Sequence, residues 1–150
     1  MKKGKVYFQN NTVSLIILII SIILTLFYYM YFNTTNMNFE AEFSYNLLTV
    51  NTVFAGFLYT MLGNMVEFST RPKIREKDKA GYIDKYFSPI YFGLFFFVIS
   101  VSIEMLILFF NLDWYLSFLL FISRACSFVG VLYFITSSYM LRRMINQVRK

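Results

Sequence analysis

Val13–Phe32 reads VSLIILIISIILTLFYYMYF, twenty residues without a charge. A helix of this length is about 30 Å long, which matches the hydrocarbon thickness of a bilayer. Lys2, Lys3 and Lys5 precede it, as they would in a signal peptide. The apolar region is too long for a signal peptide, however, and aromatic residues stand where small residues would mark a cleavage site. We therefore expect a membrane-spanning helix that stays in the protein.

Three more stretches of the chain are long and apolar. The predicted spans are 13–32, 45–65, 87–112 and 114–141, of which the third contains Glu104 and the fourth contains Arg124. Only 15% of the 150 residues are charged, against about 25% in an average soluble domain. Backbone groups in lipid must be paired within their own helix. The sequence thus predicts an all-α integral membrane protein, a single domain over residues 1–150 built as a bundle of four transmembrane helices.

The basic residues predict the orientation of this bundle. All but one of the fourteen basic residues lie in the N-terminal arm, in the connection between the second and third spans, or in the C-terminal tail. The connections 33–42 and 111–113 contain none. Because cytoplasmic loops carry the excess of Lys and Arg, we expect a multi-pass protein of the cell membrane with both termini and loop 67–88 in the cytoplasm.

The composition also excludes several classes of function. There is no His and one Cys, so an intrachain disulfide, imidazole chemistry and a multi-cysteine metal site are impossible. No phosphate-binding glycine loop or nucleophile triad is present. The net charge of +6 is expected for a membrane protein, because basic residues collect in cytoplasmic segments and meet anionic lipid headgroups there. We therefore expect a protein that is not an enzyme and has no cofactor, metal or nucleic-acid partner.

Glu104 and Arg124 are the ionisable residues deep inside the predicted spans. A charged side chain at mid-membrane costs roughly 2.5–3.5 kcal/mol to insert. Both residues lie at a similar depth, about 12–15 Å from the turn that joins their spans. We predict an intramembrane ion pair between them. This pair would either fix the register of the two helices, or line a polar cavity or switch between partners in an oligomer. In a third alternative, the two side chains face different neighbours and form no pair.

The second span carries small and polar residues along one helix face. They are spaced 3, 4, 4, 3 and 4 residues apart: Thr49, Thr52, Gly56, Thr60, Gly63 and Glu67. Small residues let helices approach closely in lipid, and hydroxyls bond between helices. This polar stripe predicts either a packing seam or a water-lined path. Ser123, Ser127, Gly130 and Ser137 repeat the pattern in the fourth span, and Ser100 precedes Glu104 by one turn in the third.

Loop 67–88 is the largest polar element. It carries six basic residues: Arg71, Lys73, Arg75, Lys77, Lys79 and Lys85. They either anchor the protein to anionic headgroups or dock an anionic ligand or a cytoplasmic protein partner. Pro89 is expected to open the third span.

Two segments carry a family resemblance. Asn51–Gly63 (NTVFAGFLYTMLG) and, after the basic loop, Gly81–Gly93 (GYIDKYFSPIYFG) resemble small four-span membrane proteins of low-GC bacteria. Some of those occur in phage-defence loci, where a membrane protein works with a cytoplasmic sensor or effector. Small multidrug transporters have a similar size, but they carry an essential carboxylate in the first span, which has no charge here.

Three functions follow as hypotheses. The first is an oligomeric membrane sensor or effector subunit of a bacterial defence or stress system, for which we expect a homo-oligomer. The second is an immunity protein against a membrane-active toxin or bacteriocin, which gene neighbourhood would distinguish from the first. The third is a small ion channel or transporter that uses Glu104, Arg124 and the threonines of the polar stripe.

Overall fold

The computed structural model describes residues 11–32, 41–70, 84–110 and 116–148. These residues form four helices and no strand: α2 (Thr12–Phe32), α3 (Ala41–Ser69), α5 (Asp84–Phe109) and α6 (Leu116–Val148). The prediction of an all-helical fold is therefore confirmed for the described part of the chain. Three segments are long and apolar enough to cross a membrane, Ala41–Ser69, Lys85–Phe109 and Leu116–Asn146, while the apolar part of α2, Thr12–Tyr28, is shorter.

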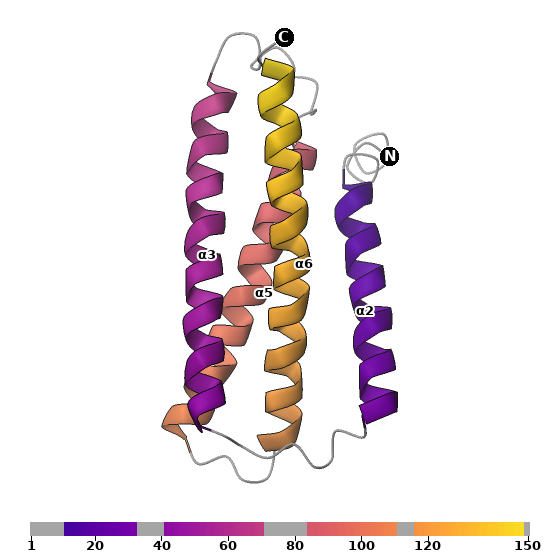
Figure 1. Ribbon diagram of the computed structural model, residues 1–150, viewed down its shortest axis with the longest axis vertical. Helices are drawn as coiled ribbons and strands as arrows, with labels where there is room; N and C mark the ends of the chain where they lie inside the picture. The colour runs from indigo at the N-terminus through magenta and orange to yellow at the C-terminus, as the bar shows by residue number, and fades with distance from the viewer. Residues whose placement is uncertain (1–10, 33–40, 71–83, 111–115, 149–150) are drawn as a thin grey trace, which may run out of the picture.

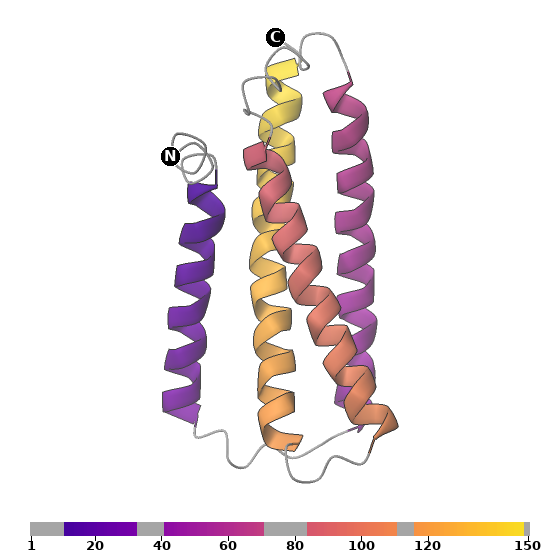
Figure 2. The same ribbon diagram turned by 180° about the vertical axis from the view of Figure 1, so that it is seen from behind.

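The helices alternate in direction along the bundle (Figures 1 and 2). The start of α2, the end of α3, the start of α5 and the end of α6 lie at one end, which we call the terminal end. α5 lies against both α3 and α6, and α2 stands beside α5 and α6, away from α3. The structure is thus a three-helix core with α2 added on one side.

The core helices pack through a seven-residue repeat. The buried residues of α3 are spaced seven apart: Ser44, Asn51, Leu58 and Met65. Those of α5, apart from Pro89, alternate by four and three residues: Tyr86, Ile90, Gly93, Phe97, Ser100, Glu104 and Ile107. This spacing keeps one seam facing a neighbouring helix, as in the packing of coiled coils. The repeat therefore determines which residues of α3 and α5 face the interior of the bundle.

The interior changes character along its length. The buried apolar cluster lies toward the terminal end: Leu58, Met65, Tyr86, Ile90, Phe97, Met140 and Met144. The half toward the opposite end contains fully buried polar side chains, Ser44, Asn51, Ser100, Glu104 and Ser123. This polar half contains the candidate site.

Pro89 lies inside α5 instead of opening it, so our expectation for this residue was wrong. The helix begins at Asp84, and Pro89 occupies its second turn. At this position the proline removes the backbone hydrogen bond to the carbonyl oxygen of Lys85, and its ring crowds that carbonyl group, while the ring itself is buried within the bundle. The helix nevertheless begins before the proline.

Candidate functional site in the polar half of the bundle

Four buried side chains join the three core helices. Asn51 of α3 donates from Nδ2 to Ser100 Oγ of α5 at 2.9 Å, and Ser127 Oγ of α6 donates to Asn51 Oδ1 at 2.6 Å. Ser100 Oγ donates to the carbonyl oxygen of Ser123 at 2.8 Å. Polar groups buried from water need such partners, and each pair holds two helices in register. We call these residues the Asn51 network.

Glu104 lies one turn beyond Ser100 on the same face of α5. Its side chain is 0% exposed, and neither carboxylate oxygen has a hydrogen-bond partner among the described residues. The hydroxyl of Ser44, on the buried face of α3, likewise has no partner. Because Asn51 pairs with Ser100 between antiparallel helices, Ser44 and Glu104 both lie between the Asn51 network and the end opposite the termini. An unpartnered carboxyl group therefore occupies the polar half of the bundle.

Arg124 does not bond to this carboxyl group. Its Cζ atom lies 4.4 Å from the ring centroid of Phe43 on α3, and its Nε has no hydrogen-bond partner in the part of the chain that the structure describes. A guanidinium over an aromatic face is attracted by the ring quadrupole. The predicted ion pair between Glu104 and Arg124 is therefore absent from the structure.

The rotation of α6 explains why the pair does not form. Ser123 faces Ser100 in the interior, and the next residue on an α-helix is turned by about 100°. Arg124 therefore leaves α6 on a different side, while Glu104 shares the interior face of α5 with Ser100. The two residues face different neighbours, which was the third of the alternatives that the sequence left open.

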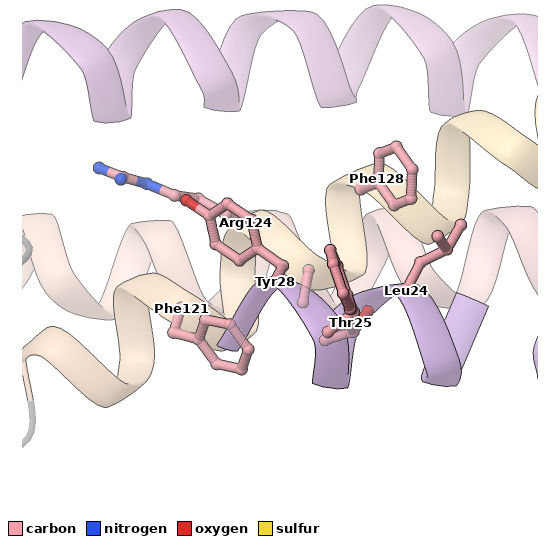
Figure 3. A pocket seen from close by; sticks show the side chains of 8 residues that line it. Leu24, Thr25, Tyr28, Phe121, Arg124 and Phe128 are labelled. Carbon is pink, nitrogen blue, oxygen red and sulfur yellow. The ribbon is translucent and has the colours of Figure 1, made fainter. Parts of the chain in front are cut away.

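The stem of Arg124 lines a crevice between α2 and α6 (Figure 3). The crevice has a volume of about 430 Å³ and is lined by Leu24, Thr25, Phe27, Tyr28, Phe121, Arg124, Ala125 and Phe128. The guanidinium extends away from Leu24, Thr25 and Phe128 in this view. The crevice is therefore an apolar space with the charged group turned out of it.

The polar stripe of α3 faces away from the bundle. All six of its residues are exposed, and a Cβ added at Gly56 or Gly63 would meet no atom within 4 Å. The hydroxyls of Thr49, Thr52 and Thr60 donate to carbonyl oxygens of their own helix. Among the described helices the stripe is thus no packing seam, and the heptad face with Asn51 packs inward instead.

Lys85 is the residue of the predicted basic loop that the structure describes. It lies in the first turn of α5, with Nζ 5.0 Å from the ring centroid of Tyr86. Arg71, Lys73, Arg75, Lys77 and Lys79 lie outside the described residues. The structure therefore describes one of the six basic positions.

The sequence analysis did not identify Asn51 as the centre of the buried network. Its signal was the spacing of Ser44, Asn51, Leu58 and Met65, which continues from polar to apolar residues. A search for polar residues alone misses this repeat, because Leu58 and Met65 are apolar.

A scan against protein-family models found no match, and searches of curated proteins and of solved structures found none either.

Proposed function

We propose that the protein is a non-enzymatic, multi-pass protein of a bacterial cell membrane that works as an oligomeric sensor or effector subunit of a defence or stress system. α2 would be the fourth span, with both termini and loop 67–88 in the cytoplasm, where the basic residues meet anionic headgroups and a protein partner. The defence or stress context rests on the resemblance of Asn51–Gly63 and Gly81–Gly93.

The observation that carries the oligomer is the outward polar stripe of α3. Gly56 and Gly63 leave open space on a helix that is long and apolar enough to cross a membrane. Small residues on such a face allow a second helix to approach closely, and van der Waals packing then drives association. The occupant we propose is the same stripe of a second copy.

Replacing both glycines tests this proposal. Gly56→Leu combined with Gly63→Leu adds bulk where this chain offers no neighbour, so the single-chain fold should remain. We expect self-association to weaken about tenfold or more, equivalent to about 1.4 kcal/mol, as measured by detergent-corrected mass and by energy transfer between labelled chains in vesicles.

The matched control is Val50→Phe, which adds bulk at an exposed position of α3 off the stripe. It should leave association unchanged. A wild-type mass equal to one 17.8 kDa chain, or an unchanged mass of the glycine variant, would contradict the proposal.

A small channel or transporter is a second candidate, favoured by the buried Glu104 beside the Asn51 network. Polar groups inside a membrane bundle mark ion and proton pathways. Flux through protein-containing vesicles, with Glu104→Gln as the control, is the test. Absence of flux from the wild-type protein would exclude this candidate.

A further inference from the structure

The crevice between α2 and α6 is apolar and opens to the outside of the bundle. Its volume is about 430 Å³, and three of the residues that line it, Leu24, Phe27 and Phe128, remain exposed. Apolar atoms around such a space lose packing contacts unless a neighbour fills it. The proposed contact between copies uses α3, which lies away from α2. Since we place α2 and α6 in the membrane, the neighbour that can enter the crevice is a lipid acyl chain.

Arg124 connects this crevice with the end of the bundle opposite the termini. Its backbone lies eight residues after the start of α6, about 12 Å along the axis. Its guanidinium lies over Phe43, two residues after the start of α3, or about 3 Å along that helix. In Figure 3 the guanidinium points away from Phe128, toward the start of α6. Long basic side chains in membrane helices extend in this way to reach the headgroups, so the stem belongs to the crevice and the charge to the headgroup level.

The guanidinium of Arg124 has N–H groups that can bind an anion. A guanidinium carries five N–H donors, whereas the ring of Phe43 attracts its charge without supplying an acceptor oxygen. Between Arg124 and Glu42, the exposed acid next to Phe43, the structure has no ion pair, and Glu104 faces the interior of the bundle. Phosphate oxygens accept paired hydrogen bonds from a guanidinium. A phosphate group at this end of the crevice would therefore complement Arg124 in charge and in geometry.

We propose that the crevice and Arg124 together form a binding site for an anionic phospholipid. One acyl chain fills the crevice between α2 and α6, and the phosphate accepts hydrogen bonds from the terminal nitrogens of Arg124 while the guanidinium stays over Phe43. With the termini in the cytoplasm, this phosphate lies in the outer leaflet. The site rests on the membrane location proposed above, and it is independent of the oligomer and of the defence context.

Photo-cross-linking of the full wild-type chain in vesicles tests the position of the acyl chain. The probe is a phosphatidylglycerol with a diazirine in one acyl chain, present as a minor component of phosphatidylcholine vesicles. We expect the cross-linked peptides to cluster at the crevice, at residues 24–28 of α2 and 121–128 of α6. A phosphatidylcholine with the same diazirine should give weaker labelling there. Labelling spread evenly over the exposed faces of all the described helices would overturn the site.

Arg124→Gln tests the phosphate contact. By native mass spectrometry we expect the wild type to retain phosphatidylglycerol about tenfold better than phosphatidylcholine with the same acyl chains, and Arg124→Gln to retain the two lipids equally. Arg142→Gln, at an exposed position of α6 near the terminal end, should keep the preference. A preference that persists in Arg124→Gln would overturn the proposal. Release of the lipid by excess inorganic phosphate would overturn it too, since the site would then bind a free anion.

Ala125→Phe tests the crevice by filling it. Ala125 lines the crevice, so a phenyl ring there occupies the space of the acyl chain while Arg124 remains. We expect retention of both lipids to fall. Val98→Phe, at an exposed position of α5 outside the crevice, is the matched control and should retain both lipids as the wild type does. Unchanged retention by Ala125→Phe would contradict the site.

A carbonate wash of the vesicles separates this site from the membrane location on which it rests. A chain that stays in the washed vesicles without cross-links at the crevice would overturn the lipid site alone. A chain that the wash removes would overturn the membrane location and the lipid site with it. Both wild-type measurements require no variant to fold.

Discussion

Two glycines bring α5 and α6 into close contact. A Cβ added at Gly93 would lie 2.7 Å from Leu58 Cδ1 and 3.2 Å from Tyr133 Cβ, and one added at Gly130 would lie 2.8 Å from the ring of Phe97. In lipid, where hydrophobic burial does not drive helices together, such close packing supplies much of the association energy. Gly93 and Gly130 therefore stabilise the bundle because the absence of a side chain lets the neighbouring helices approach closely.

Gly130→Ala should destabilise the bundle by about 1–3 kcal/mol, because the Phe97 ring must move in a packed interior. Gly56→Ala is the matched control, since the added methyl group meets open space and alanine favours a helix by up to about 1 kcal/mol over glycine. A thiol-reactive dye that reports exposure of Cys126, the single and partly buried cysteine, can follow thermal unfolding in detergent. Equal unfolding temperatures for the two variants would contradict this packing.

Glu104 and Arg124 show what the sequence reveals about a single residue in a membrane helix. Their distance from the connecting turn follows from the helical rise, so their depth could be predicted. Their direction around the helix axis could not, because it depends on how α5 and α6 are rotated against each other. That rotation is set by the whole seam, including Ser100, Ser123 and Gly130, and not by the attraction of two charges.

At the scale of the elements, α3 has two faces that both suit helix packing. One carries the stripe from Thr49 to Glu67, and the other the heptad positions from Ser44 to Met65. The sequence predicted the helix from its apolar length, but it could not choose the inward face, because lipid accepts threonine hydroxyls that bond to their own helix. The choice follows from Asn51, whose side-chain amide is satisfied by serines of α5 and α6.

α2 is held to the core near its start. Tyr133 Oη donates to the carbonyl oxygen of Ser14, and Ser88 Oγ donates to Ser14 Oγ, both at 2.8 Å. Further along, the apolar crevice separates α2 from α6. α2 is therefore attached by polar contacts near its start and by the stacking of Tyr28 on Phe121 near its end.

Tyr133→Phe should loosen α2 without disturbing the core, because the ring remains and one hydrogen bond worth about 0.5–1.5 kcal/mol is lost. Hydrogen exchange followed by mass spectrometry should show faster exchange in α2 peptides and unchanged exchange in α3. Tyr139→Phe, at an exposed position of α6, should change neither helix. Faster exchange in every helix would mean that the hydroxyl supports the whole bundle and would contradict this assignment.

Over the whole molecule, the main apolar cluster and the buried carboxyl group of Glu104 lie at different levels along the bundle axis. The apolar cluster lies toward the terminal end, where it holds α3, α5 and α6 together. The unpartnered polar atoms of Ser44 and Glu104 lie toward the other end.

The direction of this axis in the membrane can be tested by labelling. In a Cys126→Ser background, Glu42→Cys lies at the start of α3, and Thr12→Cys and Asn146→Cys lie at the terminal end, all at exposed positions. Because the basic residues predict cytoplasmic termini, a membrane-impermeant maleimide should label the cysteine at 42 in intact cells, and those at 12 and 146 only after permeabilisation. Labelling of both Thr12→Cys and Glu42→Cys in intact cells would show that α2 does not cross the membrane. Labelling of Asn146→Cys but not of Glu42→Cys would show that the orientation is opposite to the predicted one.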